Sequence, residues 1–262
     1  MSNDEFSNAM DVALNSYSIP GEFGECASKI TITLDEFEKS VFLTKAQDEI
    51  FLNLYSGKNV YGDYFESTEE MRRALDNLVV TKVYNSPLNN PEQVAIVNTD
   101  TEEEPTYIDV DRPVLTNLSK LYRLPADIAF ITLEQVEYTD TDTCKDGFKA
   151  KVYPIAQDEY DRVKDNPFRG PTKYKVLRLD WGARIVELIP AEGFTIGKYF
   201  IKYLKKPTPI ILIDLPDGLK IHNESSKSEC EMDEIVHNLI LDRAVALAYQ
   251  SKSIGINNTK RE

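Results

Sequence analysis

The chain has 262 residues, with 44 acidic and 30 basic side chains and a formal net charge of −14. A chain of this length can bury roughly three quarters of its unfolded surface, so one elaborate domain or two small ones can fold without disulfides. The acidic balance weakens the case for a protein that wraps nucleic acid, because such proteins neutralise phosphates with clustered Lys and Arg. The three cysteines are far apart and form no CxxC pair, which favours a reducing compartment over a disulfide framework or a structural zinc site.

Residues 1–29 are polar with scattered Gly and Pro, which predicts an arm that is flexible or docked on a partner. The first ten residues have neither a basic start nor an apolar core, so they are unlike a signal peptide. No apolar run reaches the length of a membrane-spanning helix, and we expect no membrane partner.

Residues 30–82 are predicted to form a helical portion with a helical hairpin. The apolar residues of this region recur at helical spacing, and Gly57 is a plausible stop for the first long helix. Three pairs have the spacing of a capping box: Thr33 with Glu36, Thr44 with Gln47, and Ser67 with Glu70.

Residues 83–217 are predicted to form a β-rich portion, either a sandwich or a barrel-like sheet. Residues 128–138 and 148–155 have the pattern of two strands that flank a turn at Asp146-Gly147. Residues 174–180 and 183–189 predict a second hairpin about Trp181-Gly182.

Residues 198–251 carry the clearest pattern of the chain. Residues 198–204 are aromatic and β-branched, which predicts a strand, and the apolar run 210–215 predicts a strand that is buried on both faces. Ser228 and Glu231 have capping-box spacing, so a helix is predicted from Ser228 to residue 251. Residues 218–251 would complete the helical portion, and residues 252–262 are predicted to be a disordered tail.

The order of helices, then strands, then a helix favours an α+β fold over a doubly wound sheet. The N-terminal helical hairpin and the C-terminal helix would pack together, with the β-rich portion between them in sequence.

The sequence contains no motif that predicts catalysis, a cofactor or a metal. His237 lies beside an apolar helical stripe and is interpreted as a structural histidine, and His222 has no partner at metal spacing. Residues 193–199 approach a phosphate-binding loop, but the glycines are one residue too close and Tyr199 stands where Ser or Thr would bind magnesium. Residues 140–151 begin like a calcium loop but lack its later ligands.

Lys198, Lys202, Lys205 and Lys206 form the one notable basic cluster. They could contact phosphate or an acidic patch of a neighbouring subunit. Alternatively, they protect a sheet edge from pairing with another edge.

Four segments resemble the neck ring proteins of crAss-like tailed bacteriophages. The matching segments are 42–49 with 65–66 and 69–75; 166–171 with 177–180; 199–212; and 230–232 with His237, Ile240 and 244–245. They occur in order from about residue 40 to 251, and the first and third are the most distinctive.

The resemblance implies a non-enzymatic virion protein in the phage neck, between portal and tail, with a role in the DNA channel. It also implies a ring of twelve copies whose partners are the portal protein and other neck or tail ring proteins, with DNA passing but not bound specifically. A ring needs a head-to-tail contact between two different patches, and the basic segment 198–206 could meet the acidic run 100–104 of the next copy. The candidate interface residues are Lys202, Lys205, Lys206, Phe168, Arg169, Leu239 and Ile240.

Two alternatives remain open from the sequence. A phage-associated adhesin module would agree with the tyrosine content and the β-rich middle, and should be a monomer or trimer that binds glycan. A hydrolase with an unrecognised acidic site is the third interpretation, and should lose activity when one or two carboxylates are substituted.

Overall fold

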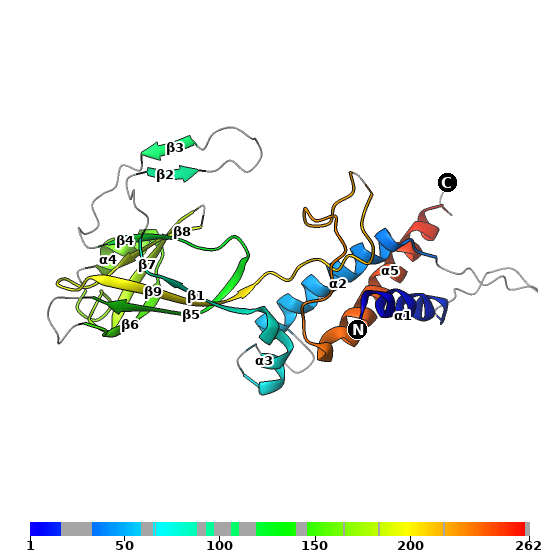
Figure 1. Ribbon diagram of the computed structural model, residues 1–262, viewed down its shortest axis with the longest axis horizontal. Coiled ribbons are helices and arrows are strands. Elements are labelled where there is room, and N and C mark those ends of the chain that lie inside the picture. Colours follow the sequence, from blue (N-terminus) through cyan, green and yellow to red (C-terminus); the bar gives the residue numbers. More distant parts are fainter. Residues whose placement is uncertain are drawn as a thin grey trace, which may run out of the picture. The chain divides into compact units, whose positions relative to one another are not determined.

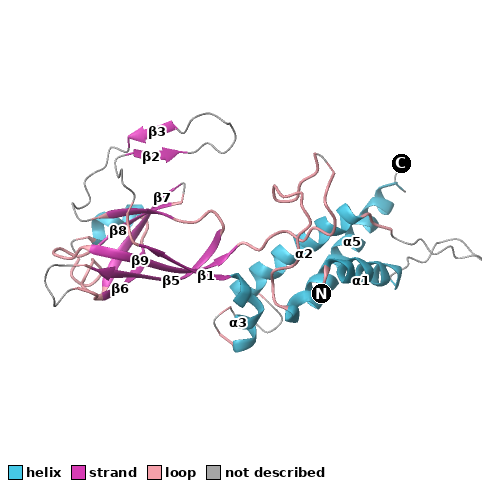
Figure 2. Cartoon of the chain, in the orientation of Figure 1, coloured by secondary structure: helices cyan, strands magenta, loops and turns pink. Residues whose placement is uncertain are grey.

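A computed structural model describes residues 1–16, 33–58, 65, 67–87, 93–96, 106–109, 119–139, 146–164, 166–182, 184–216 and 218–259. The chain divides into two compact units, a helical unit of residues 1–78 and 206–262 and a β unit of residues 79–205. The predicted α+β class is confirmed, since helices occupy both ends of the sequence and strands lie between them (Figure 2).

The helical unit is built on two long helices, α2 and α5, that lie side by side (Figure 1). The N-terminal helix α1 packs mainly against α5. The elements of this unit are α1 (Asn3–Ser16), α2 (Glu36–Ser56), α3 (Glu69–Leu75), the 3-10 turn η1 (Asp76–Leu78), the 3-10 turn η3 (Glu234–Val236) and α5 (His237–Thr259).

Helix α1 corrects the first part of the predicted arm. Phe6, Met10 and Leu14 recur every four residues, so they lie on one face of the helix, and all three are buried. This apolar stripe gives residues 3–16 a packed helix in place of a flexible arm. Residues 17–29 of the predicted arm lie outside the described residues.

Helix α2 begins and ends at well-defined caps. The Asp35 carboxylate accepts a hydrogen bond from the Glu38 N–H at 2.6 Å, and the Glu38 carboxylate accepts one from the Asp35 N–H at 3.4 Å. This reciprocal pair is the capping box, so the predicted pairing of Thr33 with Glu36 is wrong. Gly57, with a φ of 74°, ends the helix as predicted.

The other two predicted boxes in this region are also wrong. Thr44 and Gln47 lie inside α2, where both are buried and bond to a distant segment instead. Thr68, not Ser67, caps α3, because its hydroxyl accepts a hydrogen bond from the Met71 N–H at 3.3 Å.

The C-terminal helix begins later than predicted. Ser228 does not cap it, because its hydroxyl donates to the carbonyl of Pro209. Asp233 caps the 3-10 turn η3, and α5 follows directly. The backbone of α5 continues to Thr259, which differs from the disordered tail predicted for residues 252–262.

The apolar run 210–215 is buried as predicted but does not form a strand. Ile210 and Ile211 have no exposed surface. The backbone of Ile211 pairs with that of Ser228 in an isolated bridge, and the run belongs to no strand of either sheet. Side chains of α1 and α2 bond to the N–H and carbonyl of Ile210, the carbonyl of Ile211 and the N–H of Leu212, so these buried groups do not need a strand partner.

The β unit contains a curled seven-stranded sheet (Figures 1 and 2). The strand order is β1-β9-β5-β6-β7-β8-β4, and the neighbours are antiparallel except for β6 and β7. The strands are β1 (Val79–Tyr84), β4 (Lys120–Arg123), β5 (Ile128–Tyr138), β6 (Lys149–Pro154), β7 (Lys175–Gly182), β8 (Ile185–Ile189) and β9 (Ile196–Lys205). The unit also has a separate ribbon of β2 (Gln93–Ile96) and β3 (Thr106–Asp109), a 3-10 turn η2 (Gln157–Glu159) and a short helix α4 (Tyr160–Val163).

Both predicted hairpins are confirmed. β5 pairs with β6 beyond a turn in which Gly147 has a φ of 73°, and β7 pairs with β8 next to Gly182, whose φ is 83°. The strand predicted over 198–204 is the central part of β9. The sheet starts at Val79 and ends at Lys205, so it begins and ends earlier than the predicted span of 83–217.

Tyrosine rings fill much of the sheet's core. Tyr122 and Tyr199 are buried with ring centroids 5.0 Å apart, and Tyr84 stacks on Tyr199 at 5.6 Å. Burial raises the pKa of Tyr122 to about 12, so this phenol stays neutral at physiological pH. These three tyrosines are therefore accounted for by packing in the core, whereas Tyr153 and Tyr174 are exposed.

Candidate assembly interface

The basic residues predicted at an interface divide between the two units. Lys202 is exposed on β9, and Lys205 is the last residue of that strand. Lys206 is exposed in the helical unit. Burial raises the pKa of the Asp48 carboxyl, and the charges of His222 and Lys206 oppose that rise, so Lys206 already has an acidic neighbour in its own unit. The proposed acidic counterpart, residues 100–104, lies outside the described residues.

Phe168 stands out from the β unit on an ordered turn. Its side chain is 92% exposed. The side-chain oxygen of Asn166 accepts hydrogen bonds from the N–H groups of Phe168 at 2.9 Å and Arg169 at 3.2 Å. The Asn166 carbonyl accepts a third bond from Gly170 N–H at 2.7 Å. These bonds hold the backbone of the turn in position and leave the aromatic ring in water.

Gly170 makes this turn possible. A Cβ at Gly170 would lie 2.7 Å from the carbonyl oxygen of Asn166 and 3.0 Å from those of Val163 and Lys164. Backbone oxygens cannot move aside as a flexible side chain can, so a larger residue would open the turn. We call residues 166–170 the Phe168 turn.

Leu239 and Ile240 face different surroundings on α5. Successive helical residues are about 100° apart around the axis, so neighbours in sequence rarely share an environment. Ile240 has no exposed surface, whereas Leu239 is 49% exposed. Ile240 therefore belongs to the core of the helical unit, and Leu239 is the member of the pair that can contact a partner.

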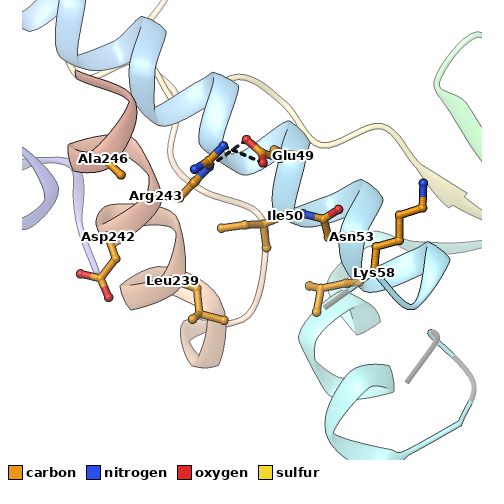
Figure 3. Close-up of a pocket in the computed structure, with 9 residues that line it drawn as sticks. Glu49, Ile50, Asn53, Lys58, Leu239, Asp242, Arg243 and Ala246 are labelled. Carbon is orange, nitrogen blue, oxygen red and sulfur yellow. Dashed lines mark hydrogen bonds and ion pairs between the residues drawn. The ribbon is translucent and has the colours of Figure 1, made fainter. Parts of the chain in front are cut away.

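Leu239 forms one edge of a groove between α2 and α5 (Figure 3). The groove has a volume of about 380 Å³. We call it the α2–α5 groove; its lining residues are Glu49, Ile50, Asn53, Leu54, Lys58, Leu239, Asp242, Arg243 and Ala246. The side chains of Ile50 and Leu239 lie on opposite walls, with the charged residues around them (Figure 3).

An ion pair bridges the two walls of the groove (Figure 3). The guanidinium of Arg243 donates two hydrogen bonds to Glu49, from Nε at 2.9 Å and from Nη2 at 2.8 Å. This bidentate geometry fixes both side chains and neutralises both charges. Asp242 is exposed at the preceding position of α5, and its carboxylate makes no ion pair with any residue of the described ranges.

Sequence reasoning selected Leu239 but missed the opposite wall. The residues Glu49, Ile50, Asn53 and Leu54 have the spacing of one helical face, so the sequence contained a signal for that wall. The pairing of this face with α5 depends on the tertiary fold, because almost 200 residues separate Glu49 from Arg243.

The most buried charged cluster lies inside the β unit. Glu134 on β5 accepts hydrogen bonds from Arg178 on β7 and from the hydroxyl of Tyr199 on β9. Burial, together with the charge and hydrogen bond of Glu134, raises the pKa of Tyr199 well above its ordinary value. The cluster joins side chains of β5, β7 and β9, so it is a cross-strand tie.

His237 is a structural residue, as predicted. It is 5% exposed; its Nδ1 lies 2.6 Å from the Met1 amino group, and its Nε2 lies 3.1 Å from the carbonyl oxygen of Met232. Burial and the Met1 charge lower the pKa of His237, against the opposing effects of Met232, Glu234 and Asp233. Its neutral form can thus accept from Met1 and donate to Met232.

Within the described ranges, no three His, Cys, Asp or Glu side chains gather as a metal site would require. In the same part of the chain, no helix combines the length and apolarity that crossing a membrane would need.

Comparison with known proteins defines the class of the chain. A family model described as phage tail ring protein 3/4 matches residues 1–260. The chain is 43% identical over 255 residues to ring protein 3 of Bacteroides phage crAss001, covering 97% of each chain. It is 34% identical over 258 residues to ring protein 4/5 of the same phage, covering 95% of this chain and 92% of the relative.

These matches identify a structural protein of a phage tail, which confirms the resemblance seen in the sequence. The chain belongs to the phage tail ring protein 3/4 family. It is therefore a virion-associated protein.

Proposed function

We propose that the chain assembles with itself into a ring in the neck of the virion, between the portal and the tail, and lines part of the DNA channel. The family match over residues 1–260 carries the proposal. The ring has twelve copies, to match the symmetry of a portal vertex, and its faces meet the portal protein and other ring proteins.

The protein acts in this ring without catalysing a reaction. The two buried glutamates of the β unit both have structural partners, which supports this view. Glu134 binds Arg178 and Tyr199, and Glu187 accepts a hydrogen bond from the Trp181 Nε1–H at 2.7 Å. Both carboxylates therefore have a role in holding the sheet together, which accounts for their burial without a substrate.

The net charge of −14 suits a channel that DNA passes without sticking, because few phosphates would be neutralised by Lys or Arg. We assign Lys202, Lys205 and Lys206 to contacts with an acidic surface of a neighbouring copy. Reversing the charges of Lys205 and Lys206 should then impair assembly, and unimpaired assembly would remove this assignment.

Two measurements test the proposed ring. Mass spectrometry of purified virions should detect the chain, and negative-stain microscopy of the purified protein should show closed particles of twelve-fold symmetry. Absence of the chain from mature virions would overturn the proposal. A ring of another symmetry would retain assembly but reject the copy number.

A further inference from the structure

We propose that the Phe168 turn of one copy inserts into the α2–α5 groove of the neighbouring copy, and that this contact joins copies around the ring. The inference rests on the proposed ring function and deepens it, since it names the two surfaces that meet. The occupant of the groove is thus a second copy of this chain.

The Phe168 turn has the properties of an interface anchor. A phenyl ring that is 92% exposed costs free energy in water, and its burial in a complex recovers that cost. The hydrogen bonds to Asn166 fix the turn before binding, so little conformational entropy is lost on association. Aromatic residues and Arg are also the residue types enriched in protein interfaces, and Phe168 and Arg169 supply one of each.

The α2–α5 groove has a suitable size and lining for this ring. Apolar cavities of about 150 Å³ hold benzene, so a groove of about 380 Å³ has room for the Phe168 ring and part of the turn. Ile50, Leu54 and Leu239 give it an apolar floor and edge. Leu239, at 49% exposed, would lose much of its contact with water when the ring binds.

The charges beside the two surfaces are complementary. The Arg169 guanidinium makes no ion pair with described residues, and neither does the Asp242 carboxylate on the groove's rim. Glu49 and Arg243 neutralise each other, so Asp242 is the acidic group left for Arg169. Lys58, the remaining charged residue of the lining, follows the C-terminal end of α2. Its positive charge repels Arg169, which favours an approach of Arg169 to the α5 side of the groove.

The two surfaces differ from each other, so the contact is head-to-tail. Such a contact leaves one turn and one groove free on every dimer, and it therefore propagates until the ring closes. A closed dimer, in which each turn fills the other copy's groove, would stop at two copies and give no ladder beyond the dimer.

Site-directed cross-linking tests the contact. The protein would carry Pro167→Cys, next to the anchor, and Ala246→Cys, in the groove lining, so that Phe168 and Leu239 stay in place. Cys26 and Cys144 would be replaced by Ser, and a short bis-maleimide reagent added. Cys230 can stay, because burial raises the pKa of its thiol to about 11 and leaves little thiolate at neutral pH. The expected result is a ladder of covalent oligomers on a denaturing gel.

The matched control pairs Pro167→Cys with Leu52→Cys. Leu52 lies on α2, is 51% exposed and does not line the groove, so this control should give no ladder. Equal ladders from both pairs, or a product that stays at the monomer mass, would overturn the inference.

Substitutions give an independent readout of association. Phe168→Ala should weaken assembly about thirty-fold or more, as for an interface anchor, whereas Leu133→Ala, at another exposed position of the β unit, should not. Arg169→Asp and Asp242→Arg should each weaken assembly, and the double variant should restore it. Because these side chains are exposed, the folding of the variants should be unaffected.

The outcomes separate this inference from the ring function. A wild-type chain that forms a discrete ring, with no ladder and no effect of Phe168→Ala, would overturn the contact and leave the ring intact. A wild-type chain that stays monomeric up to its solubility limit, and is absent from virions, would overturn both.

Discussion

Backbone groups of the β unit bond mainly to other backbone groups, whereas residues 208–212 of the helical unit bond largely to side chains. In the sheet, seven strands pair in a continuous ladder, and the side chains are left to form the core. In the helical unit, polar side chains of α1 and α2 reach a buried segment that has no ladder of its own.

The helical unit uses four such side chains. Thr44 both accepts from the Ile210 N–H at 3.1 Å and donates to the Ile210 carbonyl at 3.2 Å. The other bonds run from Asn3 to the carbonyls of Ile211 and Ser228, from Gln47 to the carbonyl of Thr208, and from the Leu212 N–H to Ser40. Each bond replaces a rung that a neighbouring strand would supply, so each depends on one particular residue.

This difference predicts distinct responses to substitution. A ladder survives the loss of most single side chains, whereas a segment held by side chains does not. The single tryptophan, Trp181, lies on β7, so its fluorescence reports on the β unit. Far-ultraviolet ellipticity is dominated by the helices, so the two units can be followed separately.

The largest loss of stability is expected in the β unit, at the buried ion pair of Glu134 and Arg178. Glu134→Ala leaves Arg178 buried without its main partner, which should destabilise the β unit by about 3–5 kcal/mol. Denaturant unfolding followed by Trp181 fluorescence measures the loss.

Glu137→Ala is the matched control on the same strand. Its pair with Lys198 is partly exposed, and removal should cost at most about 1 kcal/mol. Equal losses from both variants would show that burial does not set the strength of these pairs.

The next effect tests the side-chain bonds of the helical unit. Thr44→Val should leave the N–H and carbonyl of Ile210 buried without partners and cost about 2–4 kcal/mol. The helical ellipticity should be lost at lower denaturant, while the Trp181 transition stays in place.

Thr132→Val provides the comparison in the β unit. Its hydroxyl bonds to the carbonyl of Lys202 at an exposed position, so the change should stay within about 0.5 kcal/mol. A Thr44→Val variant as stable as this one would show that residues 208–212 do not depend on side-chain hydrogen bonds.

A smaller effect is expected where α1 joins α2. The Lys39 ammonium, which is 4% exposed, binds Asp11 at 2.7 Å and Glu36 at 2.9 Å. Burial alone would lower the pKa of Lys39, but the hydrogen bonds and charges of these two carboxylates together raise it. Lys39→Met should destabilise α1 by about 1–2 kcal/mol, because the carboxylates can still be hydrated.

Hydrogen exchange across residues 3–16 measures this loosening. Lys45→Met, at an exposed position of the same helix, should leave exchange unchanged. Similar protection of α1 in both variants would mean that its apolar stripe alone holds it.

The smallest effect concerns pH. The pKa of His237 is lowered in the folded chain, so the unfolded chain binds its proton more readily below the ordinary value of 6.5. The contribution of His237 to stability is complete above pH 6.5 and is lost as the pH falls from there toward the lowered pKa. Thermal unfolding of the helical unit across this window should therefore depend less on pH in His237→Gln.

His222→Asn is the control for this pH dependence. His222 has a φ of 50°, which Asn tolerates, and its ring is largely exposed beside Asp48. The variant should keep the wild-type slope. If His222→Asn removes the pH dependence of thermal unfolding and His237→Gln does not, that dependence does not come from His237.

The strands were predictable because their burial follows the sequence directly. In β9, Tyr199, Ile201 and Tyr203 are buried and alternate with Lys198 and Lys202, as a sheet with two faces requires. The two hairpins were predictable for the same reason, with glycines at their turns.

The helical unit was less predictable, for two physical reasons. The run 210–215 is apolar enough for a central strand, and nothing local reveals that Thr44 and Ser40 supply its hydrogen bonds. Ser228 and Glu231 have the spacing of a capping box, but the Ser228 hydroxyl donates its hydrogen bond to the carbonyl of Pro209. Helix α1 could have been predicted from the sequence. Phe6, Met10 and Leu14 have helical spacing, but the polar composition of residues 1–29 favoured the prediction of an arm.

The candidate interface was partly predictable. Exposed residues of a tight turn, such as Phe168 and Arg169, can be recognised from the local sequence. The α2–α5 groove cannot, since its walls come from opposite ends of the chain. Ile240 was selected with Leu239 because sequence alone does not fix which of two adjacent apolar residues faces the core.

The most direct test of the account is an electron cryomicroscopy map of the assembled ring that resolves side chains. The account predicts that the ring of Phe168 from one copy lies between Leu54 and Leu239 of the next, with Arg169 beside Asp242. A map in which Phe168 remains in solvent, or in which another segment fills the α2–α5 groove, would contradict it.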